Sequence, residues 1–319
     1  MTTKRSATDL EAIGISIGCD PELFVYDTKA KRYISPHEFI PGTKDKPHQL
    51  RVGTVQLDGL AVEFGIAPSY TPRDFTRNIE GTLSCVKELL PEGMELHAVS
   101  SVWFDKDYFD KEMPESSKVL GCEPDFNANK DGEINPRPDG MIVKDNKVLR
   151  TGAGHIHIGW GQDFDVGDEQ HLMNCILLTK KLDSLFKIAE PAWDTDTTRR
   201  EMYGALGSFR PKPYGMEYRV PSNAWLKSTA LRKYVYDLVY FAVQTLYVGL
   251  DSGYIKYNVY GDYDWDKTLN MYKIRTIPLK SATELYNARM TWQHAAGNPT
   301  IISPYYSEYI TNSAYKIVV

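Results

Sequence analysis

The pattern of apolar and polar residues predicts several strands and three long helices. Strict alternation over residues 155–160 (HIHIGW) predicts a strand with two histidines on one face and two isoleucines on the other. Apolar residues at helical spacing predict helices near residues 71–90, 168–190 and 228–250. The sequence predicts more strands than a fold with regularly alternating strands and helices would contain. It therefore predicts an α+β fold with a mostly antiparallel sheet.

Shorter patterns predict the remaining elements. Further strands and hairpins are expected at residues 13–26, at 52–69 around the turn Asp58-Gly59, at 97–104 and at 141–150. Residues 191–216 contain several arginines and glycines but show no clear period. We therefore expect a long irregular segment there.

Composition and charge narrow the class of protein. Of the 319 residues, 42% are hydrophobic and 25% are charged, which is ordinary for a soluble globular protein. The net charge of −5 argues against a general nucleic-acid binder, which needs a basic face. Four scattered cysteines without a C-x-x-C pair favour a reducing, cytoplasmic location. Residues 235–250 are too short an apolar run to span a bilayer, so we expect no membrane association.

Two acidic residues interrupt the first predicted strand. Asp20 and Glu22 are two residues apart, so an extended backbone would turn both carboxylates to the same face. Pro21 lies between them and cannot donate to a ladder, which indicates an edge or a bulge. Carboxylates that point inward beside an apolar run need a positive charge close to them. One interpretation is that they bind a divalent cation. A loop cap at Asp20 is the other interpretation.

Further acidic residues occur in the neighbouring strands. Glu63 lies between Val62 and Phe64, inside an apolar run, and is a stronger functional candidate than Asp58, whose place in a turn is explanation enough. The segment GCEPDFNA repeats the acid–Pro–acid pattern with Glu123 and Asp125. Whether these two acids join a site is left open.

Two further polar pairs fall on predicted strands. His155 and His157 share one face about 7 Å apart, a spacing that suits metal or phosphate binding. A half-buried strand whose histidines meet solvent is the ordinary alternative. Glu217 and Arg219 also lie two residues apart, where a same-strand ion pair of little energetic weight is the alternative.

Together the pairs favour a hard divalent cation. Carboxylates with one or two imidazoles favour Mg²⁺ or Mn²⁺, whereas catalytic zinc would want more His or Cys. Acids for cations combined with arginines for phosphates are typical of ATP-dependent phosphoryl transfer. The GxxxxGK[ST] phosphate loop is absent from the sequence.

Three of these segments resemble known enzyme motifs. GCDPE (18–22), GAGHIHIGW (152–160) and MEYRVPS (216–222) are similar to the G-x-E-x-E, G-x-x-x-H-x-H and E-x-R segments of glutamine synthetase and γ-glutamylcysteine ligase. With QLDGLAVEFGIAPS and CEPDFNA, the ordered series looks most like the carboxylate–amine ligases encoded by some bacteriophages. Asp20 departs from the pattern, because many relatives have Glu there.

The resemblance implies a fold and an activity. It implies a glutamine synthetase-like fold with a curved, mostly antiparallel sheet packed by helices, as a catalytic domain over residues 14–250. Residues 1–13 would form a tail, and residues 251–319 an extension packed on the same domain. The implied reaction joins a small-molecule or peptide carboxylate to an amine, using Mg²⁺-bound ATP and an acyl-phosphate intermediate. The location would be the host cytoplasm if the chain is phage-encoded.

The resemblance also implies roles for individual residues. The implied metal ligands are Asp20, Glu22, Glu63, His155 and Glu217. The implied nucleotide-binding residues are His157, Arg219, Arg210 and Arg199, with Arg200 as an alternative to Arg199. Arg219, Arg210 and Glu63 would act in catalysis.

Other classes of protein use some of the same residues or the same general fold. A guanidino kinase uses ATP on this general fold but releases a phosphorylated guanidine. A metal-dependent hydrolase would use H-x-H and carboxylates without ATP, but the other five histidines show no partner pattern. A phage structural or interaction protein could keep the fold without catalysis. The identity of both substrates and the oligomeric state are left open.

Overall fold

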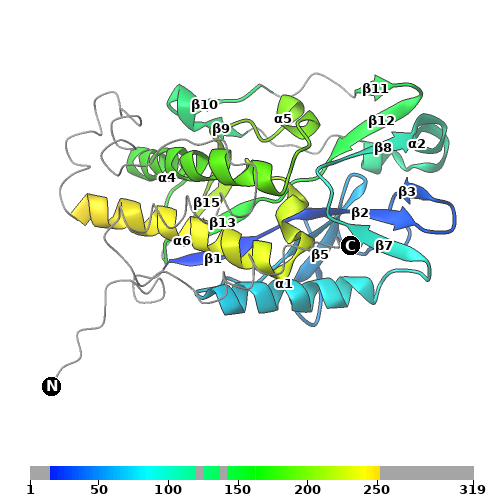
Figure 1. The fold of residues 1–319 in the computed structure, drawn as a ribbon, viewed down its shortest axis with the longest axis horizontal. Helices are drawn as coiled ribbons and strands as arrows, with labels where there is room; N and C mark the ends of the chain where they lie inside the picture. The colour runs from blue at the N-terminus through cyan, green and yellow to red at the C-terminus, as the bar shows by residue number, and fades with distance from the viewer. Residues whose placement is uncertain (1–14, 119–124, 137–141, 162, 252–319) are drawn as a thin grey trace.

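The computed structural model describes residues 15–118, 125–136, 142–161 and 163–251, and they form an α+β fold (Figure 1). The strands are β1 Ser16–Cys19, β2 Glu22–Asp27, β3 Arg32–Ile34, β4 His48–Gln49, β5 Thr54–Asp58, β6 Ala61–Gly65, β7 Met94–His97, β8 Ser101–Asp105, β9 Phe126–Asn127, β10 Glu133–Ile134, β11 Val143–Lys144, β12 Lys147–Thr151, β13 Ile156–Gly159, β14 Ser208–Lys212 and β15 Gly215–Tyr218. The helices are α1 Pro72–Lys87, α2 Lys106–Glu112, α3 Glu115–Lys118, α4 Glu169–Ala189, α5 Thr198–Met202 and α6 Thr229–Asp251, with 3-10 turns η1 Ala128–Lys130, η2 Glu190–Ala192 and η3 Asn223–Lys227. The predicted fold class is confirmed.

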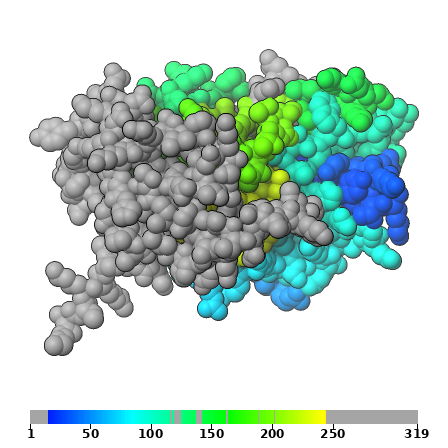
Figure 2. Space-filling view, in the orientation of Figure 1, coloured from blue at the N-terminus to red at the C-terminus, as the bar shows by residue number. Residues whose placement is uncertain are grey.

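The strands form three antiparallel sheets. The first has the order β1-β13-β15-β14-β9-β10, and the second has the order β3-β2-β6-β5-β4 with β7 also paired to β2. The third, β11-β12-β8, lies with α2 at one end of the molecule (Figure 1). In the space-filling view, side chains from β2, β3, β8 and α2 make a continuous surface at that end (Figure 2).

The chain passes from the first sheet to the second at Asp20 and Pro21. β1 pairs with β13 up to Cys19, and β2 pairs with β6 from Glu22 onward. The single strand expected over residues 13–26 is therefore wrong, and the two short strands belong to different sheets. Pro21 permits the change because it has no N–H to leave unpaired, while its carbonyl still accepts from Phe64 N at 3.3 Å.

The three long helices are close to their predicted positions. α1, α4 and α6 lie side by side over one face of the first sheet (Figure 1). Asp168 caps α4 by accepting a hydrogen bond from His171 N at 2.7 Å. None of the described helices is both long enough and apolar enough to cross a membrane.

The helices bury their apolar stripes against the first sheet and leave the other face of that sheet to polar side chains. The buried stripes include Phe75, Ile79, Val86, Leu178, Leu182, Leu185, Val235, Val239 and Ala242. Burial of such side chains is worth roughly 1.5–3 kcal/mol each and fixes which face of the sheet is covered.

Several predicted boundaries are wrong. Residues 97–104 do not form one strand, because β7 pairs with β2 whereas β8 pairs with β12. Residues 191–216 contain α5 and β14, so the segment is more regular than expected. Asp58 pairs with Ala61, so the β5–β6 turn is Gly59-Leu60, one residue later than predicted. Residues 1–14, Glu123 and residues 252–319 lie outside the described residues, and the expected domain boundaries remain predictions.

Candidate active site

The register of the first sheet aligns polar residues across three strands. His157 on β13 is the Cα partner of Glu217 on β15, which in turn is the partner of Arg210 on β14. Directly opposite residues project to the same face of a sheet. The uncovered face therefore carries an imidazole, a carboxylate and a guanidinium side by side.

A second row follows two residues further along each strand. Asp20 comes after the end of β1, His155 comes before β13, and Arg219 comes after β15. Because side chains alternate with a period of two, these residues share the face of the first row. The His155 and His157 rings both lie near Asp20, in agreement with their predicted common face.

The second sheet contributes a set of acids. Glu22 on β2 is opposite Glu63 on β6, which is opposite Gln56 on β5. Gln56 Nε2 donates to Glu63 Oε2 at 2.9 Å, and Ala153 N donates to Glu22 Oε2 at 2.9 Å. Asp58 follows two residues after Gln56 on the same strand and faces the same space.

Both sheets line one cavity of about 420 Å³. It brings together seven of the predicted site residues, namely Asp20, Glu22, Glu63, His155, Glu217, Arg210 and Arg219. We call its side formed by Asp20, Glu22, Asp58 and Glu63 the acidic wall, and its side formed by Arg210, Lys212 and Arg219 the basic wall.

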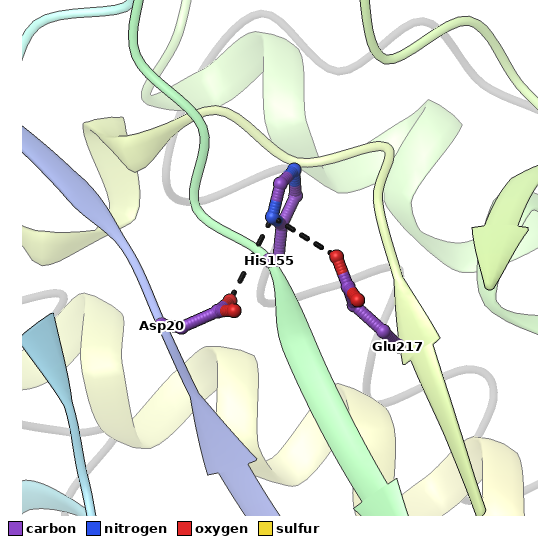
Figure 3. A group of neighbouring side chains, drawn as sticks. All are labelled: Asp20, His155 and Glu217. Atoms are coloured by element: carbon purple, nitrogen blue, oxygen red, sulfur yellow. Dashed lines mark ion pairs between the residues drawn. The ribbon is translucent and has the colours of Figure 1, made fainter. Parts of the chain in front are cut away.

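Asp20, His155 and Glu217 all line this cavity and point toward one another, and we call these three residues its centre (Figure 3). His155 Nδ1 lies 3.3 Å from Glu217 Oε1 and 3.7 Å from Asp20 Oδ1, and one ligand atom of each residue lies within 4.8 Å of the others. Asp20 Oδ1 is buried and makes no hydrogen bond of regular geometry with the described residues. Two carboxylates and one imidazole whose ligand atoms converge in this way fit a hard divalent cation.

The basic wall surrounds Glu217. Arg219 forms an ion pair with Glu217 Oε1, while Arg210 Nη1 and Lys212 Nζ lie 3.3 Å and 3.0 Å from Glu217 Oε2. Burial alone would raise the pKa of Glu217, but Arg219, His155 and the other neighbouring cations outweigh it and hold the pKa well below its usual range. Glu217 is therefore a charged carboxylate, although it is almost fully buried.

On the acidic wall, burial and neighbouring negative charges raise the pKa values of the carboxyl groups. Burial, followed by the negative charge of Asp20 and Asp58, raises the pKa of Glu63 well above its usual range. Burial and Asp58 likewise raise the pKa of Glu22 to about 7. Like charges so close together disfavour ionisation unless a cation neutralises them. The cavity thus has one side that attracts cations and one that attracts anions.

The electrostatics of His155 keep its imidazole neutral. Burial, together with the nearby Arg219 charge, lowers the pKa of His155 well below its usual value. A neutral ring nitrogen has a lone pair, which is the form that binds a metal ion. The predicted use of His155 as a ligand is compatible with this environment.

His157 lies between the central cavity and a second cavity of about 530 Å³. Its Nε2 lies 2.9 Å from Asp20 Oδ1, and its Nδ1 contacts the hydroxyl of Tyr214. The second cavity shares Asp20 and Gly65 with the central one and is lined elsewhere by small residues such as Gly18 and Gly159.

Arg199 and Arg200 are not on the basic wall. Arg199 is buried, donates to Val220 O at 2.6 Å and Arg219 O at 3.2 Å, and lines a third cavity of about 80 Å³ that also includes Glu22 and Arg219. These hydrogen bonds support the backbone beside Arg219. Arg200 forms an ion pair with Glu190 at 2.9 Å.

Asp125 also belongs to this region, which the sequence left open. Asp125 Oδ2 lies 3.5 Å from Arg219 Nε, and Asp125 lines the cavity of about 80 Å³. The carboxylate is therefore placed to orient Arg219.

Among the residues that line these cavities, sequence reasoning did not single out Gln56, Lys212 or Tyr214, and it set Asp58 aside. For Lys212 a signal existed, because it lies two residues after Arg210 and so shares its face. Asp58 was set aside because of its predicted turn role, but it also follows Gln56 with the period of a strand.

Comparison with known proteins agrees with the predicted resemblance. Residues 141–259, which are less than half of the chain, match the family described as phage phiEco32-like COOH.NH2 ligase, type 2. This confirms the predicted likeness to the phage-type carboxylate–amine ligases, a family of enzymes. The matched segment contains His155, Glu217 and the basic wall, whereas the acidic wall lies outside it. No curated protein matches the chain.

Proposed function

We propose that this chain, with its phage-type carboxylate–amine ligase segment, is an ATP-dependent ligase that forms an amide through an acyl phosphate. The observation that carries the proposal is the cavity in which the acidic wall faces the basic wall across Asp20, His155 and Glu217. Cations bind at one side and phosphates at the other, as phosphoryl transfer from ATP requires. We further propose that the curved antiparallel sheets represent a glutamine synthetase-like fold.

The acidic residues would hold Mg²⁺ or Mn²⁺. Asp20, His155 and Glu217 would bind one ion, and Glu22 and Glu63 would bind a second beside it. A bound divalent ion supplies positive charge that orients the phosphates and the substrate carboxylate. The raised pKa values of Glu22 and Glu63 support this assignment, because a cation would remove the repulsion that raises them.

The basic wall would bind the transferring phosphoryl group. Arg210 and Arg219 would stabilise the charge that develops on its oxygens, and Lys212 and His157 would contact the neighbouring phosphates. The guanidiniums are already held by Glu217, so they need little reorganisation when the nucleotide binds.

The reaction would proceed in two displacements. A carboxylate oxygen attacks the γ-phosphorus, and the bond to ADP breaks. The amine nitrogen then attacks the acyl carbon, phosphate leaves with the former carboxylate oxygen, and the amine loses a proton. The first step is needed because a carboxylate has a poor leaving group until its oxygen is phosphorylated.

The cavities on either side of the centre support an arrangement of the reactants. The cavity of about 530 Å³ meets the centre at Asp20 and has room for a nucleoside. The cavity of about 80 Å³ meets the centre at Glu22, His155 and Arg219. We assign the nucleoside to the larger cavity and a compact end of a substrate to the smaller one.

The test is turnover by the purified full chain with Mg²⁺, ATP, a panel of carboxylates and a panel of amines. Mass spectrometry should detect a new amide, formed in equal amount with ADP and phosphate, only when both substrates are present. ADP and phosphate without an amide would remove the ligase proposal. A phosphorylated guanidine without free phosphate would identify a kinase instead.

A further inference from the structure

Tyr214 lies in the tight turn between β14 and β15. Lys212 and Gly215 are Cα partners, so residues 213–214 form the turn. Trp160 N donates to Tyr214 O at 2.8 Å, and Phe164 N donates to Pro213 O at 2.6 Å. The backbone that carries Tyr214 is therefore fixed from both sides.

Gly215 holds the same turn close to β13. A Cβ atom at Gly215 would lie 2.0 Å from Ile158 O, so only glycine allows this approach. The close approach brings the Tyr214 side chain over His157, and the two rings stack with centroids 5.9 Å apart and planes inclined by 29°.

Tyr214, His157 and Asp20 form a continuous polar chain. The Tyr214 hydroxyl contacts His157 Nδ1, and His157 Nε2 lies 2.9 Å from Asp20 Oδ1. Asp20 Oδ1 also lies 3.7 Å from His155 Nδ1. The chain thus leads from a hydroxyl in the larger cavity to a carboxylate at the proposed cation site.

The His157 ring is held from both of its nitrogen atoms. The Tyr214 hydroxyl contacts one ring nitrogen from the side of the larger cavity, and the other ring nitrogen forms an ion pair with Asp20. Without the hydroxyl, the Tyr214 ring would hold His157 by stacking alone.

We propose that Tyr214 is a positioning residue that orients Asp20 toward the cation through His157. This rests on the cation site of the proposed function, but it concerns a residue outside the proposed ligands. Groups that orient metal ligands through hydrogen bonds typically change metal affinity by about 10–100-fold when they are removed. Because Tyr214 acts through one intermediate ring, we expect an effect at the lower end, about tenfold.

The experiment compares Mn²⁺ binding by the full chain and by Tyr214→Phe, without nucleotide, using electron paramagnetic resonance. Tyr214→Phe keeps the ring that stacks on His157 and removes only the hydroxyl. Its affinity for Mn²⁺ should fall about tenfold, with an unchanged unfolding midpoint. Tyr70→Phe is the matched control, because Tyr70 is 40% exposed against 39% for Tyr214 and lines none of the three cavities.

A second readout concerns the His157 ring directly. Long-range ¹H–¹⁵N spectra should show altered His157 ring-nitrogen signals in Tyr214→Phe and unaltered ones in Tyr70→Phe. Wild-type Mn²⁺ affinity in Tyr214→Phe would overturn the inference, as would the absence of Mn²⁺ binding by the wild type. If Mn²⁺ binding behaves as expected but no amide forms, the proposed function fails and the role of Tyr214 stands.

Discussion

At the scale of single residues, the site combines carboxylates in opposite states. Glu217 is stabilised as an anion by Arg210, Lys212 and Arg219, whereas the largest charge effects on Glu63 come from Asp20, Asp58 and Glu22. Glu217 thus carries its charge before any ion binds. The repulsion at Glu63 is one that a bound cation would remove.

Glu63→Gln should therefore stabilise the ion-free protein while removing activity. The substitution keeps the shape and an oxygen to accept from Gln56, but it removes a negative charge beside Asp20 and Asp58. We expect a gain of about 1 kcal/mol in the free energy of unfolding, measured with urea in EDTA. Amide formation should fall by at least about 100-fold, because a ligand of the second cation is lost. A variant that is less stable and fully active would contradict both the repulsion between Glu63 and the neighbouring acids and the role of Glu63 as a cation ligand.

His155→Asn should remove activity without unfolding the protein. His155 lies between Asp20 and Glu217, and its neutral ring is held mainly by packing and by these two acids. We expect a loss of at least about 100-fold in turnover with a native circular dichroism spectrum. His97→Asn is a control for general damage: the His97 side chain is also largely buried, but it contacts the Tyr33 hydroxyl at 3.2 Å and lines none of the three cavities, so stability should fall more than turnover by the remaining folded protein. Full turnover by His155→Asn would mean that the site is misplaced.

At the scale of elements, the strand–helix interface behind the site has its own titrating group. Asp183 on α4 accepts a hydrogen bond from the Tyr218 hydroxyl on β15 at 2.8 Å. Burial raises the pKa of Asp183 to about 7. Tyr218 follows Glu217 directly, so this contact fixes the strand that carries the central carboxylate.

Asp183 should make the protein less stable as the pH rises. Its pKa in the folded protein lies above that in the unfolded chain, so ionisation costs stability. The cost is absent at pH values below the unfolded pKa, grows as the pH rises, and is complete above about pH 7. Between pH 5.5 and 8 we expect the wild type to lose about 1–2 kcal/mol relative to Asp183→Asn. Urea unfolding at both pH values measures the difference, and parallel pH profiles for the two proteins would disprove it.

The elements themselves were predicted unevenly. The three long helices and the β11–β12 hairpin follow from local patterns, because a helical stripe or a turn is set by neighbouring residues. The division of residues 97–104 into β7 and β8 does not, because both halves are extended and only their partners differ. β14 was missed for a similar reason. One of its partners, β9, lies far from it in the sequence, and the other, β15, follows after a turn in a segment that shows no clear period.

At the scale of the whole molecule, the site exists because two sheets meet at Asp20 and Pro21. The acidic wall comes chiefly from the second sheet and the basic wall from the first. The two proposed cations, one held by Asp20, His155 and Glu217 and the other by Glu22 and Glu63, would thus lie between side chains of both sheets and would be lost on unfolding.

Mn²⁺ should consequently stabilise the whole fold. At a free concentration of 100 times its dissociation constant, one bound ion adds about 2.7 kcal/mol to the free energy of unfolding. Thermal unfolding with increasing Mn²⁺, and after removal with EDTA, measures the effect. The stabilisation should be largely absent in His155→Asn. An unfolding midpoint that does not respond to Mn²⁺ in the wild type would exclude a cation shared between the sheets.

The sequence by itself determined which side chains share a face. The period of two in a strand is local, and it correctly aligned His155 with His157 and Glu217 with Arg219. The motif order also indicated the ligase family, which the match over residues 141–259 confirms. The roles assigned to these residues remain predictions.

Only the tertiary structure decided which faces meet. Strand pairing joins residues far apart in the chain, so the register that sets Glu22 beside Glu63, and Gly18 beside His157, cannot be read from either segment alone. Arg199 illustrates the limit: the resemblance implied a nucleotide contact, but its hydrogen bonds to the backbone of residues 219–220 depend on where α5 lies. Tyr214 was overlooked because a turn shows no face until the strands beside it are paired, and Asp58 was set aside because only the pairing with Ala61 shows that it belongs to β5.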